Sequence, residues 1–275
     1  MPWFPFAPLE QPGLAVPVLR AADIVYGQVG DRELGLDLYR PDAAAAPLPV
    51  VVFIHGGGWH GGMKEDYGGL AARVAAQDYL CATVDYRLAP EAAFPAALQD
   101  CQCAVRWLRA HAGELGADPG RVAAWGHSAG GHLAALVALA PGRFAPTGGW
   151  EGYPEGVQCA LCYSAPFHLA TLGPDVTPAA GAFVGGEPDA QPELWERASP
   201  LCYLAAPAAV PFLVVHGDQD DLVPVDQADR FVAALRRVGS PVRYQRLSGL
   251  GHDLAQDSPA LLDEALSFLS EVLGG

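Results

Sequence analysis

Short apolar runs recur along the chain and are separated by stretches with helical periodicity. The run at 50–54 is apolar throughout, as a strand buried on both faces of a sheet should be. Seven further strands are predicted at 24–28, 33–39, 80–84, 121–125, 157–164, 210–216 and 241–247. Helices are predicted at 67–77, 95–111, 129–140, 225–238 and 259–273. This alternation predicts an α/β fold with a mostly parallel, eight-stranded sheet and helices on both faces.

The 275 residues are expected to form one α/β domain (1–275), because the pattern shows neither an internal repeat nor a linker. Residues 1–20 are rich in proline and aromatic residues and are predicted to be irregular. They are interpreted either as a partial cap over a site or as a segment packed on the surface. Between 165 and 209 only one short helix is expected, at 193–198, so this stretch is too short for a large lid domain.

The chain is strongly acidic, with a formal net charge of −15 and Lys64 as its only lysine. This charge argues against nucleic acid and anionic membrane surfaces as partners. The first residues lack the basic and apolar regions of a signal peptide, and no apolar run could span a membrane. A soluble, cytoplasmic protein is therefore expected. The six cysteines do not form zinc-ligand pairs and are expected to be reduced and buried. The sequence contains no H-E-x-x-H and no Walker motif, so no metal and no cofactor are expected.

The segment Gly126-His127-Ser128-Ala129-Gly130 places one serine between a predicted strand and a predicted helix. A G-x-S-x-G sequence in this context is typical of a nucleophile elbow. The turn is so tight that side chains at 126 and 130 would collide with neighbouring backbone. The following helix would point its positive end toward a developing oxyanion. Because the serine follows the fifth of eight predicted strands, the pattern matches an α/β-hydrolase core.

A serine nucleophile needs a base, and the base needs an acid that orients it. In α/β-hydrolases the acid and then the histidine follow the serine along the chain. His252 is the one histidine beyond the loop where the acid is expected, and it lies in a glycine-flanked loop after the last predicted strand. Of three aspartates in the acid loop, Asp220 is the predicted acid, and Asp218 and Asp221 are expected to shape the turn. His216, at the end of the preceding strand, is interpreted as a hydrogen-bonded structural histidine.

A second cluster, HGGGW at 55–59, directly follows the third predicted strand. Consecutive glycines let the backbone approach a substrate closely, and this pattern supplies oxyanion donors in lipases and esterases. Gly57 and Gly58 are therefore expected to form an oxyanion hole together with the N–H of Ala129. Trp59 is a candidate for the substrate pocket, with a core tryptophan as an equal alternative.

Three motifs resemble those of the hormone-sensitive-lipase-like esterases: HGGGW at 55–59, DYRLAPE at 85–91 and GHSAGG at 126–131. The resemblance covers nearly the whole chain and implies the triad and the oxyanion hole named above. Within the second motif, Arg87 and Glu91 are expected to pair and to belong to the scaffold.

One position departs from that family, which usually has aspartate where this chain has His127. In this respect the chain is more similar to small esterases that include feruloyl and acetyl-xylan esterases and arylformamidases. His127 is therefore a second candidate for the substrate pocket.

The resemblance implies a serine carboxylesterase that hydrolyses short-chain or small aromatic esters through an acyl-enzyme on Ser128. A small-molecule ester is the expected partner, and no oligomeric state is predicted. An arylformamidase or other amidase is the alternative within acyl hydrolysis. A binding module on a hydrolase fold is a third hypothesis, and it fits less well because every triad position is filled.

Overall fold

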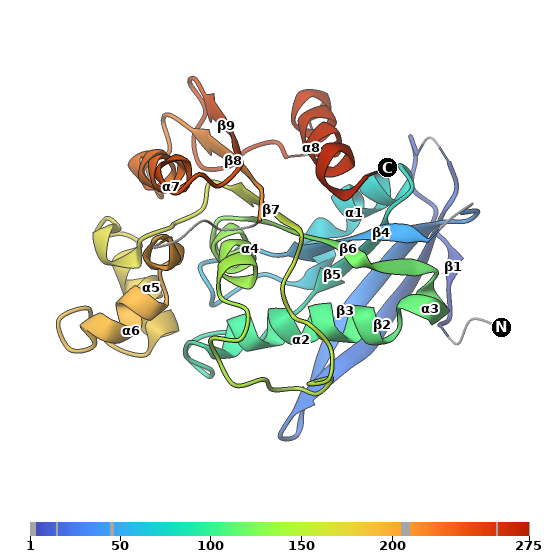
Figure 1. Ribbon diagram of the computed structural model, residues 1–275, viewed down its shortest axis with the longest axis horizontal. Coiled ribbons are helices and arrows are strands. Elements are labelled where there is room, and N and C mark those ends of the chain that lie inside the picture. Colours follow the sequence, from blue (N-terminus) through green and yellow to red (C-terminus); the bar gives the residue numbers. More distant parts are fainter. Residues whose placement is uncertain (1–3, 15, 45–46, 205–209, 257, 275) are drawn as a thin grey trace.

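The computed structural model describes residues 4–14, 16–44, 47–204, 210–256 and 258–274. This part of the chain contains a mixed nine-stranded sheet in the order β1-β2-β3-β5-β4-β6-β7-β8-β9 (Figure 1). Strands β5, β4, β6, β7, β8 and β9 run parallel to one another, and β1, β2 and β3 form an antiparallel extension beside β5. The strands are β1 (Ala7–Pro8), β2 (Val18–Val29), β3 (Arg32–Pro41), β4 (Leu48–Ile54), β5 (Leu80–Val84), β6 (Ala117–His127), β7 (Cys159–Tyr163), β8 (Phe212–Gly217) and β9 (Val242–Leu247).

The predicted α/β fold with a mostly parallel sheet is confirmed, but the predicted count of eight strands is wrong. The additional strand is β1, which pairs with β2 through Ala7↔Arg20 and Pro8↔Leu19. It lies within residues 1–20, for which irregular structure is predicted; residues 1–3 and 15 of that segment lie outside the described residues. Because β1 has two residues, both exposed, it leaves no apolar alternation by which the sequence could reveal it.

Helices cover both faces of the sheet, as predicted (Figure 1). Side chains from β4 alternate between the faces: Val50, Val52 and Ile54 join one buried cluster, and Val51 and Phe53 join the other. The second cluster includes α1 (Gly68–Ala75) and α8 (Pro259–Leu273). The first includes α2 (Ala96–Ala110), α3 (Ala112–Leu115), α4 (Ala129–Leu139) and α7 (Asp226–Arg237).

The described part of the connection between β7 and β8 contains α5 (Thr177–Val184), α6 (Pro192–Arg197), η2 (Leu169–Thr171) and η3 (Pro200–Tyr203). Helix α6 confirms the short helix predicted at 193–198. Helix α5 is missed, because Pro178 and Gly181 fall within its eight residues and weaken the helical pattern. Phe183 and Trp195 bury their side chains in the same cluster as α4. The described residues of this connection thus pack on the main core and show no lid domain.

The predicted pairing of Arg87 with Glu91 is wrong. Arg87 Nη2 lies 2.7 Å from Asp100 Oδ1 on α2, and the Arg87 backbone N–H also donates to Asp100 at 2.8 Å. Glu91 is largely exposed and lies 3.6 Å from Arg32 instead. A buried carboxylate needs a cation far more than an exposed one does, which explains the choice of partner.

All six cysteines are free thiols, and five of them are buried as predicted. Cys202 contradicts the prediction, because its position in η3 leaves it exposed. No helix within the described ranges is both long and apolar enough to cross a membrane.

Candidate active site

Ser128 occupies a strained turn between β6 and α4, with φ of 55° and ψ of −124°. The flanking glycines allow this turn to pack tightly. A Cβ atom at Gly130 would overlap the carbonyl oxygen of Ile54 on β4, and one at Gly126 would overlap the backbone of Gly130. The Ser128 N–H donates to the carbonyl of Tyr163 at 2.8 Å, which fixes the turn against β7. The hydroxyl is therefore presented at the carboxyl end of the central strands.

The structure brings Ser128, His252 and Asp220 together, although they lie far apart in the sequence. His252 Nε2 is 3.0 Å from Ser128 Oγ, and His252 Nδ1 is 2.8 Å from Asp220 Oδ2. Asp220 follows β8 and His252 follows β9, so two loops at the same sheet edge supply the pair. With Nδ1–H donating to the carboxylate, Nε2 is left to accept the serine proton.

Asp220 is held as a carboxylate by several donors. Its Oδ1 accepts the N–H groups of Leu222 at 3.0 Å and Val223 at 2.8 Å. Burial alone would raise the pKa of Asp220, but hydrogen bonds from His216, His252 and the Val223 N–H hold that pKa well below its usual range. Asp220 therefore remains negatively charged and can orient the imidazole of His252.

Asp218 does more than shape its own turn. Its Oδ1 accepts the N–H of Gly249 at 2.7 Å, which ties the loop after β8 to the loop that carries His252. Asp221, the third aspartate of this segment, is exposed. The acid loop and the base loop are thus connected independently of the bond between Asp220 and His252.

His127, a predicted pocket residue, lines the pocket and also contacts the loop of the base. Its Nε2 is 2.8 Å from the backbone oxygen of His252, and that oxygen also accepts the Ser164 hydroxyl at 3.1 Å. Burial lowers the pKa of His127, which favours a neutral ring with Nε2–H as the donor. The sequence does not point to Ser164, because a serine at the end of an apolar strand gives no distinctive signal.

Gly57, Gly58 and Ala129, the predicted oxyanion residues, line the same pocket as Ser128. Gly57 and Gly58 have φ values of 98° and 60°, in the left-handed region that favours glycine. A Cβ atom at Gly57 would also overlap the backbone of Gly61, so the loop folds back on itself there. Ala129 begins α4, and its N–H is among the first-turn donors that have no acceptor inside the helix.

Trp59 touches the pocket but is buried in the core, with 1% of its surface exposed. Its ring stacks on Phe183, and its Nε1–H donates to His132 Nδ1 at 3.1 Å. His132 Nε2 in turn lies 2.7 Å from the carbonyl oxygen of Ala198. Burial lowers the pKa of His132 to about 4, and a neutral ring with Nε2–H satisfies both contacts.

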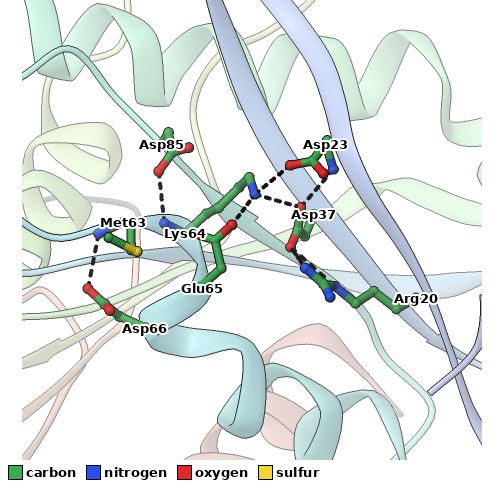
Figure 2. Close-up of polar contacts among 8 residues, drawn as sticks. All are labelled: Arg20, Asp23, Asp37, Met63, Lys64, Glu65, Asp66 and Asp85. Carbon is green, nitrogen blue, oxygen red and sulfur yellow. Dashed lines mark hydrogen bonds and ion pairs between the residues drawn. The ribbon is translucent and has the colours of Figure 1, made fainter. Parts of the chain in front are cut away.

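The glycine loop is the segment 55–62 that follows β4. Lys64 lies at its far end, at the start of η1 (Lys64–Tyr67). Figure 2 shows its ammonium group among carboxylates from three elements. The Nζ atom is 2.9 Å from Asp23 Oδ1 on β2 and 3.1 Å from Asp37 Oδ1 on β3, and it also pairs with Glu65. The Lys64 backbone N–H donates to Asp85, just after β5, at 2.8 Å.

The Lys64 cluster (Arg20, Asp23, Asp37, Lys64 and Glu65) connects strands β2 and β3 to the far end of the glycine loop. Asp23 lies at a bulge in β2 with φ of 56°, and its N–H donates to Asp37 at 2.9 Å. Burial opposes the charge on Lys64, yet Glu65, Asp23 and Asp37 together raise its pKa above the ordinary value. The sequence alone gives Lys64 no role, because two of its three carboxylate partners, Asp23 and Asp37, lie far earlier in the chain on other strands.

The pocket at Ser128 has a volume of about 470 Å³. Its apolar walls come from Val176, just before α5, from Ala179 within α5, and from Leu222 and Val223, which follow Asp220. None of its lining residues comes from the described part of 1–20. The sequence does not predict the contribution of α5 to the pocket wall, because it does not predict that helix. Asp175 and Asp253 add carboxylates, and His60 adds an imidazole.

A larger and more open hollow, of about 840 Å³, lies between α2 and residues 141–158. Its buried arginines are already engaged: Arg106 pairs with Glu155 at 2.7 Å, and Arg109 donates to backbone carbonyls. The described residues also contain no group of three or more His, Cys, Asp or Glu side chains placed to hold a metal ion.

The sheet, the elbow and the Ser128–His252–Asp220 arrangement define the α/β-hydrolase class. Within that class the chain belongs to the BD-FAE family, whose model matches residues 36–235. Esterase LipC of Mycobacterium tuberculosis (strain ATCC 25618 / H37Rv) is 35% identical over 266 residues, which are 90% of this chain and 64% of LipC. The probable carboxylic ester hydrolase LipM of the same organism is 36% identical over 241 residues, 84% of this chain and 55% of LipM. The chain thus spans 55% and 64% of the lengths of these two relatives.

A solved esterase structure has a similar fold. The thermophilic esterase Est2 of Thermogutta terrifontis matches with a TM-score of 0.78 at 28% identity, covering 96% of this chain and 94% of Est2. Est2 structures with bound propionate and with bound butyrate match equally well, with TM-scores of 0.78.

Proposed function

We propose that this protein is a serine carboxylesterase that hydrolyses short-chain or small aromatic esters through an acyl-enzyme on Ser128. The carrying observation is the continuous hydrogen-bonded series from Ser128 Oγ through His252 to Asp220, at 3.0 and 2.8 Å, opening on the pocket. Membership of the BD-FAE family and the similarity to LipC, LipM and Est2 support the ester as the bond that is cleaved.

In the proposed reaction, His252 Nε2 takes the proton from Ser128 as Oγ attacks the ester carbonyl. Asp220 stabilises the imidazolium that results. The N–H groups of Gly57, Gly58 and Ala129 receive the negative charge that develops on the carbonyl oxygen. His252 then gives its proton to the leaving alcohol, and water activated by the same ring releases the acid.

The size and chemistry of the pocket favour a short acyl chain. A volume of about 470 Å³ beside Ser128 limits the size of the acyl group that the pocket can enclose. Its apolar walls suit a few methylene groups or one small ring. The propionate and butyrate found in Est2 agree with acyl groups of this size.

A series of p-nitrophenyl esters from acetate to dodecanoate tests the proposal. We expect kcat/KM to be highest between acetate and butyrate and to fall for longer chains.

Ser128→Ala should lower kcat by about six orders of magnitude, because triad members act as a unit. A variant that keeps most of its activity would contradict the role of Ser128, and a rate that rises steadily to the longest ester would contradict the short acyl preference.

A further inference from the structure

Two histidines share one oxygen of Asp220. His252 Nδ1 is 2.8 Å from Asp220 Oδ2, and His216 Nε2 approaches the same oxygen to 3.1 Å. The side chains of Asp220 and His216 have no exposed surface. The other oxygen, Oδ1, is occupied by the N–H groups of Leu222 and Val223. Four donors therefore surround a carboxylate that water does not reach.

The contacts of His216 indicate which of its ring nitrogens carries the hydrogen. Besides Asp220, its Nε2 lies 2.8 Å from the carbonyl oxygen of Val223. Two oxygen acceptors lie near this nitrogen, so Nε2 carries a hydrogen. That hydrogen bonds to Val223 and also lies close to Asp220 Oδ2. Nδ1 is buried and has no hydrogen-bond partner among the described residues, so a second proton there would be unsatisfied. His216 is thus a neutral ring that donates through Nε2.

The backbone brings His216 to this place. His216 is the penultimate residue of β8, and a Cβ atom at the next residue, Gly217, would overlap the backbone of Leu250. The end of β8 therefore packs directly against the loop that carries His252. A side chain at 216 is held next to Asp220 by the strand itself rather than by a free loop.

We propose that His216 is a positioning residue that fixes the carboxylate of Asp220 and thereby sets the strength of its bond to His252. This inference rests on the proposed function, since it assumes that His252 is the base. The Nε2–H of His216 prevents rotation of the carboxylate and withdraws part of the negative charge from Oδ2. Without it, that charge acts more fully on His252 and stabilises the protonated imidazole.

Other titratable groups lie near the His252–Asp220 pair, in space or along the chain, and remain unchanged in the test. They lie at the end of β6, beside His252 in the loop after β9, and in the loop of Asp220 itself. They are His127, Asp253, Asp218 and Asp221.

A matched pair of variants tests the proposal. His216→Gln keeps an N–H at the ε position, whereas His216→Asn places its amide only as far as the δ position. We expect His216→Asn to lower kcat by about tenfold with KM nearly unchanged, the scale of one hydrogen bond to a charged group. The midpoint of the acidic limb of its kcat/KM profile should move to higher pH. His216→Gln should keep the wild-type midpoint and most of the activity.

Two controls separate positioning from a general loss of packing. Val214→Ala removes buried volume from the same strand and should lower the melting temperature without moving the pH profile. On the wild-type protein, ¹⁵N NMR of the histidine rings should show His216 protonated at Nε2 and not at Nδ1.

Equal impairment of His216→Asn and His216→Gln, or a His216 ring protonated at Nδ1, would overturn the proposal. NMR titration of His252 in both variants gives an answer even without turnover. If Ser128→Ala stayed active, the proposed function would fail, while the titration difference between the two His216 variants would still decide the role of His216.

Discussion

His127, the residue before Ser128, acts through a hydrogen bond to the backbone of His252. Two donors, His127 Nε2–H and the Ser164 hydroxyl, converge on the carbonyl oxygen of His252 at 2.8 and 3.1 Å. These bonds fix the peptide of the base, and the glycine-flanked loop around it supplies little rigidity of its own. The position of the imidazole over Ser128 therefore depends on both donors.

Replacing His127 by alanine should lower kcat by about tenfold and leave KM nearly unchanged, because a hydrogen bond that orients the base is lost. His127→Gln retains an N–H at the ε position and should recover most of the rate. Steady-state kinetics on p-nitrophenyl acetate measures both values. A raised KM with an unaltered kcat would instead favour the direct substrate contact that the sequence suggests.

At the scale of single residues, chain order and glycine context were enough to select Ser128, Asp220 and His252. The structure brings these three together with hydrogen-bond distances. The residues that support them could not be selected in the same way. Ser164 lies 88 positions from His252, and only the packing of two strand ends and a loop makes them neighbours.

Among the elements, the glycine loop after β4 depends on how its far end is held. Glycines from 56 to 58 and at 61 and 62 make the loop intrinsically flexible, and β4 fixes only its start. The Lys64 cluster fixes its end, since carboxylates from β2 and β3 hold the ammonium and Asp85 holds the backbone. Figure 2 shows these contacts at the far end of the loop. The predicted oxyanion donors on this loop are therefore positioned by contacts outside the pocket.

We expect Lys64→Met to destabilise the protein by about 3 kcal/mol, the scale for removing one partner from a buried ion pair. The same change should lower kcat more than it raises KM, since misplaced oxyanion donors weaken transition-state binding. Urea unfolding and kinetics on one ester measure the two effects.

The matched control is Arg230→Met. It removes a cation from an ion pair with Asp226 in which both side chains are more than half exposed. Such surface pairs contribute less than about 1 kcal/mol, so stability and rate should stay close to wild type. If Lys64→Met were as mild as this control, the cluster would not hold the loop.

Element boundaries were predictable where apolar periodicity is strong and uninterrupted. The strand at 80–84 and the helix at 259–273 match β5 and α8 at both ends. By contrast, β2 is much longer than the predicted 24–28 and contains a bulge near Asp23. That bulge serves the Lys64 cluster, a requirement that arises from β3 and η1 and cannot be read from β2 alone.

For the molecule as a whole, a buried histidine couples folding to pH. His132 on α4 is fully buried and is bonded as a neutral ring to Trp59 and Ala198. Burial lowers its pKa from 6.5 to about 4 in the folded protein. Between these two values the unfolded chain binds a proton that the folded protein excludes, so stability falls as pH decreases through this window.

The size of this effect follows from the two pKa values. At about 1.4 kcal/mol per pH unit, His132 should cost the folded state about 3 kcal/mol between pH 7 and pH 4. His132→Gln keeps an N–H for Ala198 but does not titrate. We expect it to be less stable than wild type near pH 7 and to lose less stability on acidification. Urea unfolding at several pH values gives the free energy of unfolding of both proteins as a function of pH. Subtracting one curve from the other removes the contribution of the carboxylates that both proteins contain. Parallel curves would show that His132 takes up its proton over the same pH range in the folded and unfolded states, and its neutral bonding to Trp59 and Ala198 would then be wrong.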